Sequence, residues 1–272
     1  MAFGTYIPFD QEQVQETMVA EAIKLGYRYF DTASLYMSEE ALGKAIKDSG
    51  VPREEFFIAT KAWYDEYDDI EAALDASLQR LQMDYVDLYL MHWPRRPGND
   101  NWRQTIVDTW KQYEAMADCG KAKNIGLSNF LPHHLDIVLK NCRIKPVVDQ
   151  LELHPGYNQS FAREYAKSQG LIPQAWSPLG RGCIDGEVPQ NKEFFQSLSE
   201  KYGKSVQQIF LRYQIQNGAI PVVKSINPVR MKSNYEIFDF EIEQEDMWML
   251  ECMPQNTWLG EHPDFFMPVF ER

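Results

Sequence analysis

Asp31, Lys61 and His92 each end an apolar, strand-like segment of the sequence, and 30 and 31 residues separate them. About 30 residues is the length of one strand-plus-helix unit in a parallel fold, so we expect the three side chains at equivalent strand ends. In a βα barrel, that end of the strands carries the chemistry. Tyr36 follows Asp31 closely. A carboxylate, an amine, an imidazole and a phenol can therefore meet in one pocket.

This set of groups suits the reduction of an aldehyde or ketone, in which hydride reaches carbon and a proton reaches oxygen. The proton donor needs a pKa not far above the working pH. A phenol, with a pKa of about 10, meets that need only beside a cation that stabilises its ionised form. Lys61 could be that cation, with Asp31 keeping the lysine charged and oriented. His92 could form a hydrogen bond with the carbonyl oxygen and orient the substrate.

Each of these residues also has an ordinary structural interpretation. Asp31 could cap the following helix, Lys61 could end a surface strand, and Tyr36 could pack in a loop. A single histidine such as His92 at a strand end is more often a hydrogen-bonded structural residue than a catalyst. Three such residues at successive strand ends favour the catalytic interpretation.

Strand-like and helix-like patterns alternate along the whole chain. The expected strands cover residues 3–7, 27–31, 56–61, 86–92, 123–129, 146–154, 171–176 and 220–225. The expected helices cover about 12–25, 39–47, 70–81 and 102–118, begin at Pro132 and at about 228 and 243, and include one or two between the last two strands. Eight strands that alternate with helices predict a closed (β/α)8 TIM barrel. No linker divides the 272 residues, so one domain over residues 1–272 is favoured over two smaller ones.

Composition excludes several classes of function. The net charge of −13 argues against a nucleic-acid partner and requires a local group of cations for any anionic ligand. The cysteines, Cys119, Cys142, Cys183 and Cys252, are scattered, which is typical of a reduced intracellular protein. No long apolar run predicts a membrane span and no secretory signal is evident. We expect a cytoplasmic monomer or weak dimer that acts on a small molecule.

Seven segments carry a resemblance to a known family. They are GYRYFDTASLY (26–36), TKAW (60–63), MHWP (91–94), GLSN (126–129), DQLELHP (149–155), AWSPLG (175–180) and KSINPVR (224–230). In this order, each at a strand end, they make the chain resemble an aldo-keto reductase over essentially its whole length. The resemblance is to the bacterial type, similar to 2,5-diketo-gluconate reductase-like members.

The resemblance implies a role for each of these positions. Tyr36 is expected to be the general acid, supported by Lys61 and Asp31, with His92 orienting the carbonyl. The cofactor-binding residues implied are Thr5, Ser128, Asn129, Gln150, Trp176, Ser177, Leu179, Lys224, Ser225, Arg230 and Asn234, and the substrate-binding residues are Tyr6, Trp63 and Trp93. Within the cofactor set, Ser128, Asn129 and Gln150 are expected to bind the nicotinamide carboxamide, and Trp176 to stack on its ring. Strand termination and core packing are the ordinary alternatives.

The dinucleotide must be held without a Rossmann fingerprint. The glycines of segment 180–186 have one residue too many between them, and the segment follows a late strand. In the family the cofactor lies extended over the barrel rim. Lys224, Ser225 and Arg230 then offer two cations and a hydroxyl to a phosphate monoester, which favours NADPH over NADH. Asn234 is expected to contact the adenine. Unrelated charges at a solvated helix N-terminus are the ordinary alternative.

Some positions depart from the family pattern or leave alternatives open. The N-terminal β-hairpin of the family is expected to be truncated, because Gly4 and Thr5 stand almost at the start. Ser233 stands where relatives often carry glutamate. His133 and His134 are adjacent and lack the spacing of metal ligands, so no metal is expected.

Two other functions remain open from the residues alone. The first is a regulatory or sensor protein that binds NADPH with negligible turnover, and the second is an isomerase that uses Lys61 as a Schiff base. Small aldehydes, dicarbonyls, keto-sugars and bulkier ketones are all compatible with the aromatic positions. The segment after His92 and the tail 260–270, including Phe265 and Phe266, are expected to shape specificity.

Overall fold

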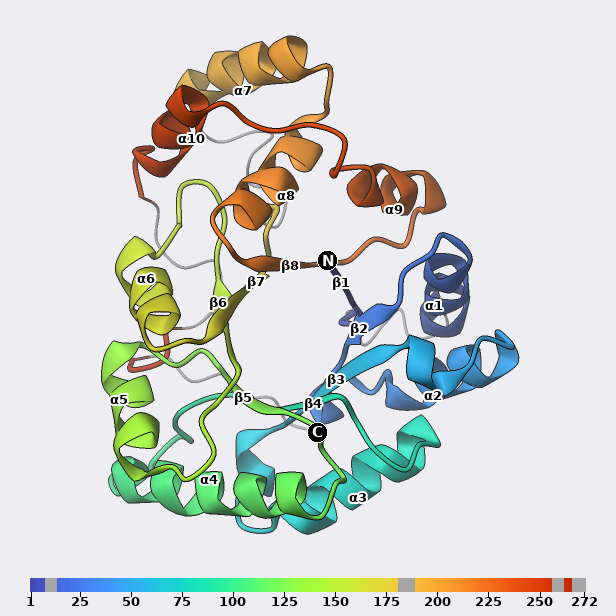
Figure 1. The fold of residues 1–272 in the computed structure, drawn as a ribbon, viewed down its shortest axis with the longest axis vertical. Helices are drawn as coiled ribbons and strands as arrows, with labels where there is room; N and C mark the ends of the chain where they lie inside the picture. The colour runs from blue at the N-terminus through green and yellow to red at the C-terminus, as the bar shows by residue number, and fades with distance from the viewer. Residues whose placement is uncertain (8–13, 181–188, 256–261, 266–272) are drawn as a thin grey trace.

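In the computed structural model, residues 1–7, 14–180, 189–255 and 262–265 are described. The strands close into a parallel barrel in sequence order, and helices surround it (Figure 1). The strands are β1 (Ala2–Gly4), β2 (Tyr29–Asp31), β3 (Phe57–Ala62), β4 (Leu88–Met91), β5 (Ile125–Ser128), β6 (Val148–Glu152), β7 (Ile172–Trp176) and β8 (Ile220–Val223). The barrel closes where β1 pairs with both β2 and β8. The expected TIM barrel is therefore confirmed.

The expected helices are present, and a further one, α6, lies between β6 and β7 where the sequence analysis named none. They are α1 (Gln15–Lys24), α2 (Glu39–Asp48), α3 (Ile70–Leu81), α4 (Trp102–Asp118), α5 (Pro132–Asn141), α6 (Ser160–Ser168), α7 (Pro189–Tyr202), α8 (Val206–Gln216), α9 (Pro228–Tyr235) and α10 (Gln244–Glu251). Short 3₁₀ turns η2 (Ser34–Tyr36), η3 (Arg53–Glu55) and η4 (Tyr64–Glu66) lie in the connections around β2 and β3. None of the helices in the described ranges is long and apolar enough to span a membrane.

Helix α3 illustrates how local sequence produces these elements. Asp69 begins the helix, and its side chain accepts a hydrogen bond from the backbone nitrogen of Ala72 at 3.0 Å. The helix ends at Gln82, whose left-handed backbone stops the chain from continuing. The apolar face expected from the sequence is confirmed as buried: Ile70, Ala73, Leu74, Leu78 and Leu81.

Several strands are shorter than the sequence predicts. The expected strand 3–7 is β1 over Ala2–Gly4, and the expected strand 146–154 is β6 over Val148–Glu152. His92 lies directly after β4, and its nitrogen donates to the oxygen of Ala62 at 3.3 Å. The last residues of these expected strands leave the sheet where the chain turns over the rim. An apolar pattern in the sequence does not show where pairing with the neighbouring strand stops. The expected helix 12–25 is α1 from Gln15, with residues 12 and 13 outside the described ranges.

A close contact between α2 and α3 depends on Gly43. A Cβ atom at this position would lie 2.1 Å from the backbone oxygen of Leu81 and 2.5 Å from its carbonyl carbon. Backbone atoms at the end of α3 cannot move away as a flexible side chain could. Only glycine allows the two helices to approach this closely, next to the turn that carries Tyr36.

Gly43→Ala is expected to lower the free energy of unfolding by about 1–3 kcal/mol, because the added methyl group forces α2 and α3 apart. Helix propensity alone predicts the opposite effect of Gly43→Ala, a rise in the free energy of unfolding of about 1 kcal/mol. Urea unfolding followed by circular dichroism measures the difference. In the same helix, Ala41→Gly is the control and should cost about 1 kcal/mol through propensity. A Gly43→Ala protein more stable than wild type would contradict the packing argument.

Candidate active site

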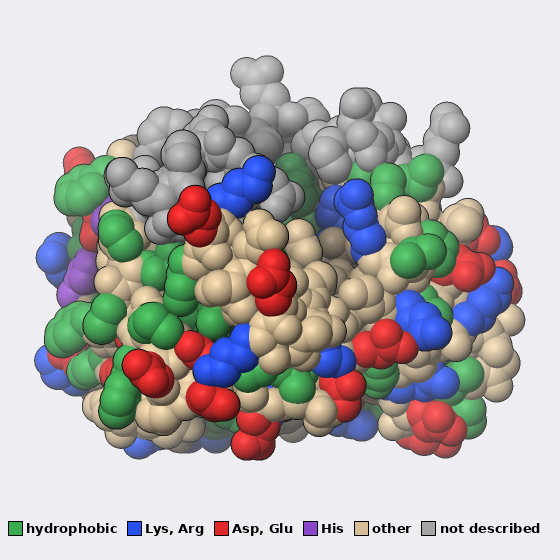
Figure 2. All heavy atoms as spheres, turned by 90° about the horizontal axis from the view of Figure 1, so that it is seen from above, with side chains coloured by type: hydrophobic (Ala, Val, Ile, Leu, Met, Phe, Trp, Pro, Cys, Tyr) green, Lys and Arg blue, Asp and Glu red, His purple; other side chains and the backbone are tan. Residues whose placement is uncertain are grey.

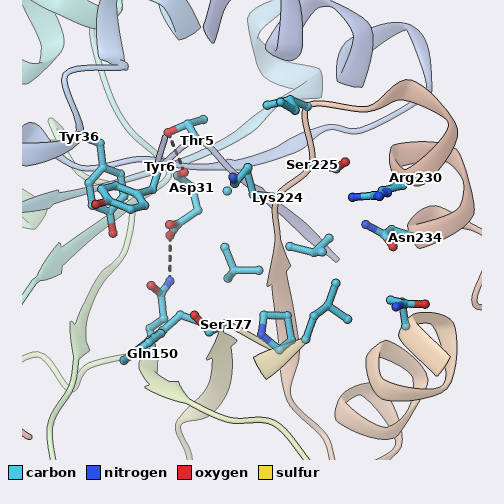
Figure 3. A pocket seen from close by; sticks show the side chains of 18 of the residues that line it. Thr5, Tyr6, Asp31, Tyr36, Gln150, Ser177, Lys224, Ser225, Arg230 and Asn234 are labelled. Atoms are coloured by element: carbon cyan, nitrogen blue, oxygen red, sulfur yellow. Dashed lines mark hydrogen bonds between the residues drawn. The ribbon is translucent and has the colours of Figure 1, made fainter. Parts of the chain in front are cut away.

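A cavity of about 1020 Å³ opens at the C-terminal ends of the barrel strands. Its lining residues come from every part of the rim, as Figure 3 shows for residues at β1, β2, β6, β7 and β8. One end is aromatic and includes Tyr6, Tyr36 and Trp63, whereas the other carries Lys224 and Arg230. Among the described lining residues, Asp31 is the only acid.

The centre of the site is a buried ion pair between β2 and β3. Lys61 Nζ donates to Asp31 Oδ1 at 2.5 Å and to the backbone oxygen of Thr32 at 3.0 Å. The Lys61 side chain is fully buried. Burial lowers the pKa of Lys61, and the charge and hydrogen bond of Asp31 oppose that fall. Asp31 therefore favours the charged form of Lys61 despite its burial.

Tyr36 and His92 face this ion pair. Tyr36 Oη lies 3.4 Å from His92 Nε2, and Lys61 Nζ lies 5.0 Å from the centre of the Tyr36 ring. Burial, reinforced by the charge of Lys61, lowers the pKa of His92 well below its usual value. His92 is therefore neutral near pH 7. The structure brings together all four residues that the sequence analysis selected.

Buried hydroxyl groups fix the turn that carries Tyr36. Thr5 Oγ1 donates to the backbone oxygen of Asp31 at 3.1 Å and lies 2.8 Å from Ser38 Oγ, which is 2.9 Å from Thr32 Oγ1. Thr5 lines the cavity but is fully buried. Its hydroxyl is thus used in support of the Tyr36 turn. The sequence analysis placed Thr5 with the cofactor and did not predict this internal network.

The residues expected around the nicotinamide form one connected group at the ends of β5, β6 and β7. Asn129 Nδ2 donates to the backbone oxygen of His92 at 3.0 Å and to Ser128 Oγ at 3.2 Å. Asn129 Oδ1 accepts from Trp176 Nε1 at 2.8 Å, which holds the indole ring at the cavity wall. Ser128 Oγ donates to the backbone oxygen of Gln150 at 3.2 Å. The donors of Ser128 and Asn129 are therefore already engaged within the protein.

Two residues of this group have unusual backbone conformations. Asn129 has φ of 64° and Ser177 has φ of 50°, both in the left-handed region. Asparagine tolerates this region, whereas for serine it costs on the order of 1 kcal/mol. Such strain often accompanies a functional site. Ser177 and Leu179 both line the cavity, as expected.

The expected phosphate-binding residues gather at the other end of the cavity. Figure 3 shows Ser225, Arg230 and Asn234 close together, with Lys224 between them and the barrel centre. Neither Lys224 nor Arg230 forms an ion pair with a described residue. Burial lowers the pKa of Lys224. Two cations without acidic partners among the described residues suit a phosphate monoester.

The N-terminus of α9 contributes less than the sequence suggested. Asn227 Oδ1 accepts hydrogen bonds from the backbone nitrogens of Val229 at 2.9 Å and Arg230 at 3.2 Å. These amides are thus capped by the protein itself. A phosphate at this junction would rely on side chains. On the face shown in Figure 2, lysine and arginine side chains are interspersed with acidic ones and form no single basic surface.

Aromatic side chains wall the end of the cavity near Tyr36. The ring centres of Tyr6 and Tyr36 are 5.1 Å apart, and those of Trp63 and His92 are 4.8 Å apart. Trp93 also lines the cavity. Tyr6 lines the cavity and is 42% exposed. Phe265 is 86% exposed and does not line the cavity, and Phe266 lies outside the described residues.

Sequence reasoning missed residues that support these walls. Glu66 Oε2 accepts hydrogen bonds from Ser34 Oγ at 2.5 Å and from the nitrogen of Trp63 at 2.8 Å. Tyr67 Oη donates to the oxygen of Trp93 at 2.7 Å and accepts from its nitrogen at 3.0 Å. Both residues follow the TKAW segment in the sequence, and that proximity was the available signal. Gln174, in β7, was also missed.

His133 and His134 meet Asp264, which the sequence spacing could not show. Asp264 Oδ1 lies 3.0 Å from His133 Nε2 and 2.9 Å from His134 Nε2. His134 Nδ1 accepts from the nitrogen of Leu131 at 3.2 Å, so the neutral ring carries its proton on Nε2. Arg95 lies 3.9 Å from the same carboxylate. A protonated Nε2, an arginine and a helix N-terminus all disfavour a cation, and the absence of a metal stays a prediction.

Comparisons with known proteins agree with this geometry. The model of the Aldo/keto reductase family matches residues 1–253. The chain belongs to the aldo-keto reductase family. Its expected resemblance is thereby confirmed, and membership makes it an oxidoreductase of carbonyl compounds.

Relatives and solved structures cover nearly the whole chain. Glyoxal reductase of Bacillus subtilis is 45% identical over 90% of this chain and 86% of its own length. Methylglyoxal reductase DkgA of Escherichia coli (strain K12) is 36% identical over 98% of this chain and 93% of its own length. An aldo-keto reductase of Bombyx mori in complex with NADP has a TM-score of 0.84 and 34% identity, over 92% of this chain and 87% of its own. An aldo-keto reductase from a Medee basin deep-sea metagenome library has a TM-score of 0.87 and 32% identity, over 96% of this chain and 93% of its own.

The neutral state of His92 predicts a pH-dependent stability. Because folding lowers the pKa of His92, the unfolded chain binds the proton more tightly, and the free energy of unfolding falls as the pH drops below about 6.5. His92→Gln removes this contribution. Between pH 7.5 and 5.5, wild type should lose about 1.4 kcal/mol more stability than His92→Gln.

Urea titrations at several pH values measure the two slopes. His134, whose pKa is lowered to about 3, is present in both proteins and cancels in the comparison. Equal slopes would show that His92 is not held neutral.

Proposed function

We propose that this protein reduces an aldehyde or ketone to an alcohol with NADPH, and that Tyr36 donates the proton. The observation that carries the proposal is the position of Tyr36 between the buried Lys61–Asp31 pair and the neutral His92, at the aromatic end of a large cavity. Few other arrangements place an acid, its supporting cation and an uncharged hydrogen-bond partner around one position in a cavity that a carbonyl oxygen can occupy.

Each of the four residues has its own role in the proton transfer. Tyr36 Oη gives its proton to the carbonyl oxygen of the substrate. The Lys61 ammonium stabilises the phenolate that remains, and Asp31 keeps the lysine protonated despite its burial. Neutral His92 forms a hydrogen bond with the same carbonyl oxygen and orients it, without competing as an acid. The aromatic walls around Tyr36 offer apolar surface to the rest of the substrate.

The residues around the cavity fit a nicotinamide dinucleotide phosphate. When bound, the reduced cofactor supplies the hydride. Trp176 offers an aromatic face, Gln150 offers a polar atom at the cavity wall, and Lys224 and Arg230 offer cations for the 2′-phosphate. The Bombyx mori neighbour in complex with NADP supports this choice of cofactor.

Small neutral aldehydes or dicarbonyls are the proposed substrates. The relatives named glyoxal reductase and methylglyoxal reductase support this class. The cavity itself adds an argument, because its described lining near Tyr36 is rich in aromatic residues, and Lys61, which is buried and paired with Asp31, is not part of that lining. A Schiff-base role for Lys61 is disfavoured, since its amine is fully buried and bonded to Asp31 and Thr32.

Tyr36→Phe is expected to lower kcat for methylglyoxal by about 10²–10⁴-fold, because the proton donor is lost while the ring remains. The loss of absorbance of the reduced nicotinamide measures the rate of NADPH oxidation. Binding of NADPH should change little, since Tyr36 is remote from the phosphate-binding end. Wild-type activity no higher than that of Tyr36→Phe, across a varied set of carbonyl compounds, would reject the function. It would favour a protein that binds NADPH without turnover.

Lys224→Ala should raise the KM for NADPH about tenfold or more and change the KM for NADH little, because a charged phosphate contact is lost. Lys232→Ala, in α9 close to Lys224 in the sequence, is the matched control. Lys232 is exposed, pairs with Glu236 at 3.7 Å and does not line the cavity. Steady-state kinetics with both cofactors test the assignment. Equal effects of Lys224→Ala on NADPH and NADH would remove Lys224 from the phosphate site.

A further inference from the structure

Gln174 is a buried polar residue that the proposed mechanism does not use. It lies in β7 directly opposite Gln150 of β6, and 1% of its surface is exposed. Its Oε1 accepts a hydrogen bond from Gln150 Nε2 at 2.9 Å, and its Nε2 donates to Tyr29 Oη at 2.7 Å. A glutamine at the centre of a barrel is costly unless both ends of its amide are bonded. In Gln174, both the oxygen and the nitrogen of the amide form hydrogen bonds.

The charge of Asp31 determines how these amides are oriented. Asp31 is paired with Lys61, and an ionised carboxylate can only accept hydrogen bonds. The Gln150 atom that lies 2.8 Å from Asp31 Oδ2 must therefore be its NH₂ group (Figure 3). The second hydrogen of that NH₂ goes to Gln174 Oε1, so Gln174 must turn its own NH₂ toward Tyr29. One buried charge thus sets a directed chain of three hydrogen bonds.

The chain leaves one atom of Gln150 uncommitted. Gln150 lines the cavity, and its Oε1 accepts no hydrogen bond from a described residue. An amide oxygen at this place can accept from the NH₂ of a carboxamide but cannot donate to one. If the amide of Gln150 turned over, it would place its oxygen against Asp31 and an N–H against an incoming NH₂. Both contacts would be repulsive.

We propose that Gln174 is a positioning residue that acts through Gln150. It prevents the Gln150 amide from rotating, so that the nitrogen stays on Asp31 and the oxygen is presented to the carboxamide NH₂ of a bound nicotinamide. The inference rests on the proposed function, because the carboxamide belongs to the proposed cofactor. Gln174 thereby ties recognition of the nicotinamide to the carboxylate that holds Lys61.

The test compares NADP⁺ with its 3-acetylpyridine analogue, which has a methyl group in place of the carboxamide NH₂. Dissociation constants are measured from the quenching of tryptophan fluorescence, with no carbonyl substrate present. Wild type should bind NADP⁺ more tightly than the analogue. In Gln174→Leu, the ratio of the two constants should fall about fivefold, the value of one neutral hydrogen bond. Gln174→Glu keeps an acceptor for Gln150 and should restore most of the ratio.

Gln214→Leu is the matched control. Gln214 is also a fully buried glutamine, donates to the oxygen of Leu153 at 3.1 Å and does not line the cavity. Its replacement should lower stability and leave the ratio unchanged. Should Gln174→Leu fail to fold, Tyr29→Phe removes the other partner of Gln174 and should lower the ratio about twofold.

The outcomes separate this inference from the proposed function. An unchanged ratio in Gln174→Leu, or in Tyr29→Phe, would reduce Gln174 to a structural residue and leave the carbonyl reductase proposal intact. A wild-type protein that does not distinguish the two cofactors would also overturn the inference. Wild type that does not bind NADP⁺ at all would overturn both. Wild type that binds and distinguishes the cofactors without turnover would overturn the function alone.

Discussion

The Lys61–Asp31 ion pair is the constraint on which the rest of the site depends. Removing each charge from water costs several kcal/mol, and the attraction between the two offsets this only where the geometry is good and the remaining polar atoms are bonded. Here Lys61 also donates to Thr32, and Asp31 accepts from Gln150. A pair held on all sides cannot relax, so its charge acts from a fixed point. Together with burial, that fixed charge keeps His92 neutral, and it lies 5.0 Å from the centre of the Tyr36 ring.

The barrel supplies the precision that this pair requires. β2, β3 and β4 are neighbours in register, so the ends of these strands place a carboxylate, an ammonium and an imidazole on one arc of the rim. The opposite side of the barrel closes the arrangement, because Gln150 reaches Asp31 across 119 positions of the sequence. A closed sheet fixes such long-range contacts without relying on loops. Loop residues then need only to hold Tyr36 over the pair, which the buried hydroxyl of Thr5 helps to do.

The sequence predicts this barrel well because the information is local. Apolar strands that recur about every 30 residues are visible in the chain, and polar residues at their ends must share one rim. What local patterns cannot show is which atoms are already used. Thr5 and Asn129 carry polar groups of the expected kind, yet both are bonded within the protein. Gln174 reads as an ordinary strand residue, and Asp264 joins His133 only through the folding of a distant segment.

The local charges at the two ends of the cavity explain how an acidic protein could bind an anionic cofactor. At physiological ionic strength, charges more than about 8 Å apart in solvent are largely screened. The net charge of −13 therefore matters less to a bound phosphate than the immediate neighbours. At one end, those neighbours are Lys224 and Arg230 without acidic partners among the described residues. At the other, Asp31 is the one acid among the described lining residues, and the buried Lys61 neutralises it. Under the proposed function, the phosphate of the dinucleotide lies at the first end and its nicotinamide at the second, which is electrically neutral toward a small carbonyl compound.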